Sequence, residues 1–114
     1  MARKNTSHSY PVITAGDMSG SLTSAETNVS YTDNVGYHAV WTGTPTGTIT
    51  VEATINGTDW DSLTLSPTIS LTGAAGSTLI SLNQIPYETV RLKYNRASST
   101  GTLNVVVMTK TLGA

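Results

Sequence analysis

Residues 48–57 have the sequence TITVEATING, in which apolar and polar side chains alternate without a break. The odd-numbered positions from Ile49 to Ile55 are apolar, and the even-numbered positions are threonine or Glu52. Because successive side chains of a strand point to opposite faces of a sheet, this pattern predicts a strand with one buried and one solvated face. The pair Asn56-Gly57 that ends it is a strong hairpin signal, since both residues tolerate positive φ.

The same period of two recurs on both sides of this strand and is interrupted by turn residues at short intervals. It predicts apolar faces at alternate positions of residues 35–41, 90–94 and 103–107, whereas helical spacing is not convincing anywhere. The chain is therefore predicted to be all-β: an antiparallel β-sandwich, jelly-roll-like, with seven to nine short strands. Buried Tyr and Trp need hydrogen-bond partners, so most of these rings are expected at the rim of the core.

Composition limits the possible functions of the 114-residue chain. It has 21 Thr and 13 Ser against only 7 acidic and 6 basic residues, and a net charge of −1, which disfavours nucleic-acid binding. Cysteine is absent, so disulfides and thiolate chemistry are excluded. The apolar runs are a few residues long, and the N-terminus lacks the apolar segment of a signal peptide. We expect no membrane span, and synthesis in a cytoplasm.

Two parts of the chain are expected. Residues 1–9 are polar and without periodic pattern, and we predict that they form an extended N-terminal arm. The preferred role of this arm is to lie on a neighbouring subunit, with packing on its own domain as the alternative. Residues 10–114 are predicted to form a single β-sandwich domain.

Titratable groups that could support catalysis are few. His8 lies in the predicted arm, and His38 lies on the second face of a strand, with Gly36, Val40 and Thr42, where a surface or interface role is the ordinary interpretation. Asp59 and Asp61 flank Trp60 and point to the same side if the segment is extended. Such a pair could bind Ca²⁺ or act as the acid and base of a glycosidase. The alternative, which we favour, is that Asp59 satisfies turn amides and Asp61 is solvated.

Basic and aromatic residues supply the remaining candidates. Arg91, Lys93 and Arg96 carry half of the basic charge within six residues, and we expect them to contact an acidic patch on a partner protein, with Arg3 and Lys4 as second candidates. Protection of an edge strand by charge is the alternative. Trp60 directly follows a turn, so an exposed ring that stacks on a sugar is a further possibility.

The segment Gly47 to Leu63, with its strand, Asn-Gly-x-x-Trp turn and returning strand, resembles a hairpin of small β-sandwich proteins of tailed bacteriophages. The segment Pro86 to Lys110 is similar to the closing hairpin of the same proteins. The resemblance implies a virion structural protein, either a head decoration or cement protein or a tail or neck component. It supplies no catalytic residues to transfer.

Together these observations predict a non-enzymatic protein, without cofactor or metal, that stabilises a phage particle by binding across neighbouring subunits. Capsid decoration is the first choice within that class. The expected partners are the major capsid protein or other virion subunits and further copies of the chain in a trimer or other symmetric oligomer, and the expected location is the virion. The alternatives are a carbohydrate-binding β-sandwich module, with Asp59, Trp60 and Asp61 as its site, and a tail, neck or fibre component.

Overall fold

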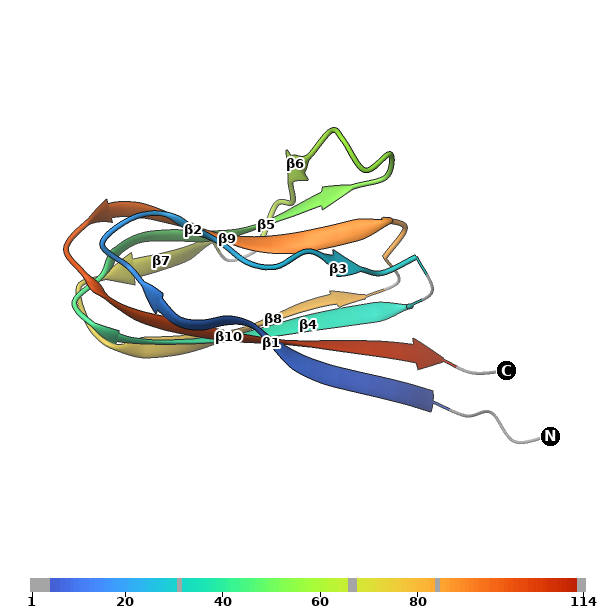
Figure 1. Ribbon diagram of the computed structural model, residues 1–114, viewed down its shortest axis with the longest axis horizontal. Coiled ribbons are helices and arrows are strands. Elements are labelled where there is room, and N and C mark those ends of the chain that lie inside the picture. Colours follow the sequence, from blue (N-terminus) through green and yellow to red (C-terminus); the bar gives the residue numbers. More distant parts are fainter. Residues whose placement is uncertain (1–4, 31, 66–67, 84, 113–114) are drawn as a thin grey trace.

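The computed structural model describes residues 5–30, 32–65, 68–83 and 85–112. These residues form two antiparallel sheets packed face to face, which confirms the predicted all-β sandwich (Figure 1). Among them, no helix is long and apolar enough to cross a membrane. The strands are β1 (Asn5–Asp17), β2 (Leu22–Thr23), β3 (Thr27–Asn28), β4 (Asn34–Gly43), β5 (Thr46–Thr54), β6 (Asp61–Ser62), β7 (Ile69–Thr72), β8 (Gly76–Asn83), β9 (Thr89–Ser98) and β10 (Gly101–Leu112).

The order of the strands is that of a jelly roll. Sheet A has the order β1-β10-β4-β8, and sheet B has the order β2-β9-β5-β6, with β3 also paired to β9 and β7 to β5. When β2 with β3 and β6 with β7 are each counted as one interrupted strand, eight strands divide equally between the two sheets, in the spatial order that two Greek keys give. The described residues thus contain ten strands where the sequence predicts seven to nine, because two long strands are interrupted.

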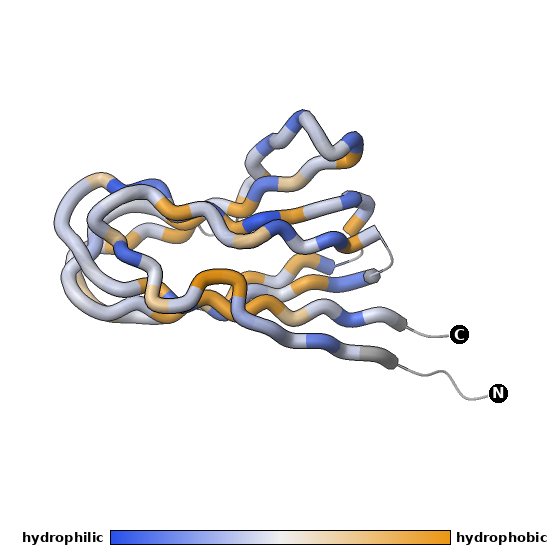
Figure 2. The backbone as a smooth tube through the Cα atoms, in the orientation of Figure 1, coloured by the Kyte–Doolittle hydropathy of each residue, from blue (hydrophilic) through white to orange (hydrophobic). Residues whose placement is uncertain are grey.

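The core lies between the two sheets, on the faces that the alternation predicts. Sheet A contributes the odd-numbered positions 35–41 and 103–107, and sheet B contributes Ile49, Val51, Val90 and Leu92, all of them buried. Hydrophobic residues concentrate along the strand segments that line the space between the layers (Figure 2). Burial of this face fixes the register of each strand, since a slip of one residue would turn the whole apolar set into solvent.

Three aromatic side chains lie inside this core, so the prediction that most rings lie at its rim is wrong for them. Tyr94 donates its hydroxyl to the Thr46 carbonyl at 3.2 Å, and the Trp41 indole donates to the Ala74 carbonyl at 3.0 Å. Tyr37 is fully buried, and its hydroxyl lies near that of Thr27, but neither makes a hydrogen bond of acceptable geometry within the described part of the chain. Burial raises the pKa of the Tyr37 phenol above its usual range.

The structure places residues 5–9 of the expected arm in β1, whereas residues 1–4, with Arg3 and Lys4, lie outside the described residues. Asn5 pairs with Leu112 and Ser9 with Met108, so the start of β1 and the end of β10 run side by side at one end of the sandwich (Figure 1). The side chains of Ser7, His8 and Ser9 are exposed. No apolar alternation marks this part of the strand, because neither of its faces is buried.

Candidate functional site

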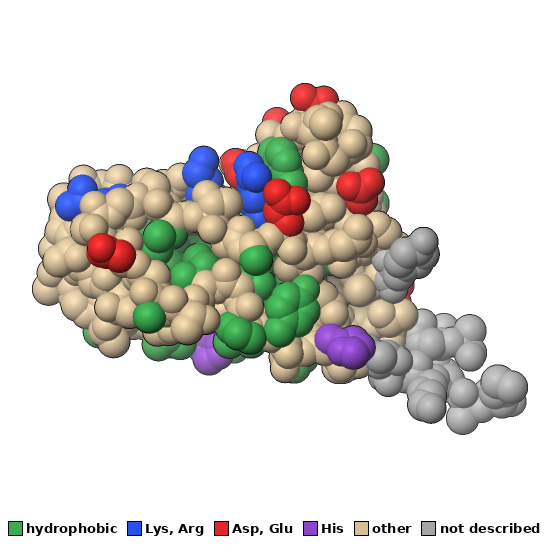
Figure 3. All heavy atoms as spheres, in the orientation of Figure 1, with side chains coloured by type: hydrophobic (Ala, Val, Ile, Leu, Met, Phe, Trp, Pro, Cys, Tyr) green, Lys and Arg blue, Asp and Glu red, His purple; other side chains and the backbone are tan. Residues whose placement is uncertain are grey.

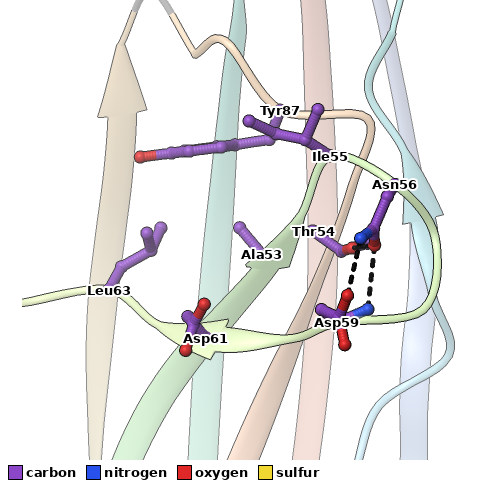
Figure 4. A pocket seen from close by; sticks show the side chains of 8 residues that line it. All are labelled: Ala53, Thr54, Ile55, Asn56, Asp59, Asp61, Leu63 and Tyr87. Carbon is purple, nitrogen blue, oxygen red and sulfur yellow. Dashed lines mark hydrogen bonds between the residues drawn. The ribbon is translucent and has the colours of Figure 1, made fainter.

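The hairpin between β5 and β6 encloses the first candidate site, a hollow of about 280 Å³. Its rear wall is Ala53 and Thr54, and the ring of Tyr87 lies across the hollow from the Asp61 carboxylate (Figure 4). The loop is longer than a two-residue turn, because β5 ends at Thr54 and β6 begins only at Asp61. Ile55, predicted to face the core, therefore leaves the sheet and is 69% exposed.

Asp59 serves the structure of this loop. The Asn56 side chain donates to Asp59 Oδ2 at 2.7 Å and accepts from the backbone N–H groups of Thr58 and Asp59 at 2.9 and 2.8 Å. Gly57 has a φ of +83°, as the turn requires. The carboxylate of Asp59 is thus engaged within its own loop, but the predicted role of satisfying the turn amides belongs to Asn56, and Asp59 accepts from the Asn56 side chain.

Asp61 is exposed, and its side chain has no hydrogen-bond or ion-pair partner within the described part of the chain. His38 lies on β4 of sheet A, whereas Asp59 and Asp61 lie on the hairpin of sheet B, so the structure does not bring these three residues together. Within the described ranges, no three His, Asp or Glu side chains gather closely enough to hold a metal ion. The hollow therefore offers one free carboxylate beside an aromatic ring.

Trp60 and Arg91 form a clasp with Glu52 on the outer face of sheet B. The Arg91 guanidinium lies 4.0 Å from the centre of the Trp60 ring, and its Nε donates to Glu52 Oε1 at 2.8 Å. Glu26 adds a second carboxylate at 4.0 Å. Basic and acidic side chains gather at the foot of the hairpin in Figure 3. Arg91 is thus neutralised within the domain, and one face of Trp60 is covered.

The other basic candidates lie apart from this clasp. Lys93 is on the same outer face as Arg91, opposite Thr50 of β5 and Thr23 of β2. Arg96 is exposed beyond it, and its Nε donates to the Ser99 carbonyl at 2.9 Å. The predicted group of three is therefore one ion-paired residue and two accessible ones, not a single basic patch.

The outer face of sheet B is otherwise polar and internally bonded. Asn95 of β9 donates to the hydroxyls of Thr48 and Thr50 on β5 at 3.4 and 3.1 Å. Threonine alternates with core residues along β5, and Glu52 completes the row. These bonds join β5 and β9 across a face of polar side chains, as on a surface in contact with water.

The outer face of sheet A, the underside of the lower layer in Figure 1, has the opposite character. Leu79 is 74% exposed, Met108 50%, Val106 43% and Val40 41%. The register puts them together: Val106 of β10 pairs with His38 of β4, which pairs with Leu79 of β8. We call these four side chains and His38 the apolar face. A hollow of about 440 Å³ opens beside them over Gly36.

Sequence reasoning missed the apolar face as a site, although its signal was present. Residues 36–42 and 104–108 place apolar side chains on the face opposite the core, where the rest of the chain has hydroxyls. Leu79 interrupts a run of hydroxyl residues on β8 in the same way. What the sequence does not contain is the strand order that brings three separate strands together.

No protein-family model matches the sequence, and no curated protein is significantly similar to it. Solved structures share its fold. The SPBc2 prophage-derived protein YomS superposes with a TM-score of 0.56 at 10% identity, covering 92% of this chain and 95% of that one. A chain of infectious bursal disease virus, Gx strain, gives 0.60 at 12% identity over 97% of this chain. The PBSX exported protein XepA gives 0.57 at 13% identity over 94% of this chain.

This chain spans 33% of the infectious bursal disease virus chain and 38% of XepA, but nearly all of YomS. At identities this low, the likeness shows a shared fold and nothing about activity.

Proposed function

We propose that this protein is a non-enzymatic structural component of a virus particle that works by covering area on neighbouring subunits. The observation that carries the proposal is the apolar face, where four large side chains from three strands are exposed together. Contiguous exposed apolar surface is uncommon on monomeric proteins and marks interaction sites. The polar outer face of sheet B would remain in water.

The shared fold adds support, because similar structures include a prophage-derived protein that is covered almost end to end and a chain of a virus. Within this class we propose decoration of the capsid of a tailed phage, with the major capsid protein or other virion subunits as partners. The protein would then be located in the virion. A tail, neck or fibre position is the alternative, and immunogold labelling of intact particles with an antibody to the chain would separate the two.

The proposal is tested by following a tagged chain through density-gradient purification of particles from cells that produce them. Val106→Asp places a charge in the apolar face, whereas Ile55→Asp places the same charge on an exposed apolar residue of the hairpin. The proposal predicts that the wild-type and Ile55→Asp chains band with particles and that Val106→Asp does not. A wild-type chain absent from the particle fraction would overturn it.

Glycan binding is a second candidate, favoured by the hollow in which the Tyr87 ring faces the free Asp61 carboxylate. A carboxylate accepts hydrogen bonds from hydroxyl groups, and a flat ring offers apolar contact. The clasp argues against the expected platform at Trp60, because Arg91 covers one face of that ring. Binding to an array of bacterial polysaccharides that is lost in Tyr87→Ala, with the fold retained, would establish this role.

A further inference from the structure

We infer that the apolar face binds a second copy of this chain, in a two-fold dimer in which Leu79 of each copy enters the hollow over Gly36 of the other. The proposed function uses the same face, so this dimer is the form of the chain in solution, and it separates when the face binds a virion subunit. Leu79 is the most exposed large hydrophobic side chain described, and Gly36 has no side chain to fill the space above it. A projection and a hollow on one surface are the two halves of a self-complementary contact.

The positions of the two features suit a two-fold axis. Leu79 pairs with His38, and Gly36 pairs with Ser81, so the projection and the hollow are diagonal neighbours on β8 and β4. With strands about 4.8 Å apart and two residues about 6.8 Å along a strand, they are separated by about 8 Å. Consider a two-fold axis that lies in the plane between two facing sheets and passes midway between the projection and the hollow. Rotation about this axis places the Leu79 side chain of each copy in the hollow of the other. His38 would then lie close to this axis.

The charge distribution favours a neutral partner. On this face, the described charged side chains lie at the two ends of sheet A: Lys110, in the row of Asn34, and Asp17, which pairs with Thr102. Between them the rows of Met108, Val106 and their neighbours contain no Asp, Glu, Lys or Arg. A strongly acidic or basic partner would find no complementary centre here, whereas a second copy presents the same uncharged surface.

The size of the face is adequate. Four strands about 4.8 Å apart and about eight residues long cover about 500 Å² in projection. Side-chain relief makes the accessible area larger than this projection, and a standard interface buries about 800 Å² on each partner. The whole outer face of sheet A, with the apolar face at its centre and hydroxyls around it, therefore has the dimensions and the layout of an ordinary dimer interface.

Gly36 provides the sharpest variant. A Cβ added there would meet only the Ile80 carbonyl oxygen, at 3.5 Å, which is an ordinary contact, so Gly36→Val can be accommodated by the monomer. Valine also suits a strand better than glycine does, so this variant should fold at least as well as wild type. It fills the hollow, however, and should weaken the dimer by about tenfold or more, because the partner's Leu79 can no longer enter.

The experiment is sedimentation velocity of the purified chain across the micromolar range. We expect a concentration-dependent dimer for wild type and for Ile55→Asp, a weaker dimer for Gly36→Val, and a monomer for Leu79→Asp. Thermal unfolding of each variant checks that the fold is retained. A wild-type monomer at every concentration, or a Gly36→Val dimer as strong as wild type, would overturn the inference. If the wild-type chain is a monomer but still bands with particles, the dimer inference fails and the proposed function stands. If it is a dimer but never bands with particles, the proposed function fails and the dimer inference stands.

Discussion

Replacing Arg91 with Gln should lower the free energy of unfolding by about 2 kcal/mol, and the structure shows where that energy comes from. The hydrogen bond from Arg91 Nε to Glu52 is 2.8 Å long, and the two side chains are 23% and 13% exposed. A hydrogen bond between charged groups contributes about 1.5–3 kcal/mol, and the contact with the Trp60 ring about 0.5–1 kcal/mol. The Glu26 pair, at 4.0 Å with Glu26 60% exposed, adds little.

Lys93→Gln is the matched control, because it removes one positive charge from the same strand and the same face. Lys93 has no ion pair within the described ranges, so its loss should cost less than about 0.5 kcal/mol. Urea unfolding followed by tryptophan fluorescence measures both variants. Together with Glu52→Gln and the double variant, Arg91→Gln forms a double-mutant cycle. We expect a coupling energy of about 1 kcal/mol or more between Arg91 and Glu52.

The reasoning would be refuted if Arg91→Gln and Lys93→Gln had equally small effects on stability. Arg91 would then be free to contact a partner, as the sequence alone suggests. A large loss of stability for Arg91→Gln, with retained banding on particles in a stabilising buffer, would show that its role is internal to the fold.

Three further predictions concern the core and the hairpin. Tyr37→Phe should raise the free energy of unfolding by about 1 kcal/mol in urea titrations, because it removes a buried hydroxyl without a described partner. The raised pKa of Tyr37 means that the folded state holds this proton more tightly, so stability is full below about pH 10 and falls as the pH rises further. Tyr37→Phe should lose less stability than wild type as the pH rises. If the urea midpoints of the variant and of wild type fell equally between pH 8 and 11, this prediction would be contradicted. Asn56→Ala should cost about 1–2 kcal/mol by removing the acceptor of the Thr58 and Asp59 amides, whereas Thr58→Ala, which leaves that acceptor in place, should cost less.

The fold could be predicted because each long strand has one buried face. The alternation along residues 48–54 and 103–107 follows directly from the contact of two sheets, and it needs no knowledge of which strands are neighbours. Where both faces of a strand are wet, as at Ser7 and His8, the alternation disappears and the strand cannot be recognised. For the same reason the sequence predicts an arm where the structure has the start of β1.

The candidate site depended on strand order, which the sequence does not contain. Arg91 of β9 contacts Glu52 of β5, 39 residues away in the sequence. The sequence suggests Arg91 as a residue for contact with a partner, whereas in the structure its guanidinium is bound within the domain. The apolar face likewise requires β10, β4 and β8 to be neighbours. That the loop bonds locally was predictable, because the partners in an Asn-Gly turn are within three residues, but the acceptor of its amides is Asn56 where the sequence suggests Asp59.

Hydroxyl-radical footprinting of the protein bound to purified particles tests most directly whether the apolar face is the buried one. Met108 on the apolar face is half exposed in the free chain, and Ile55 on the hairpin is 69% exposed. We predict that oxidation of Met108 and Leu79 is much lower on particles than in the free chain diluted until it is monomeric, while that of Ile55 and Trp60 is the same in both. Protection of Ile55 and Trp60, with Met108 oxidised as readily as in the free protein, would contradict the account.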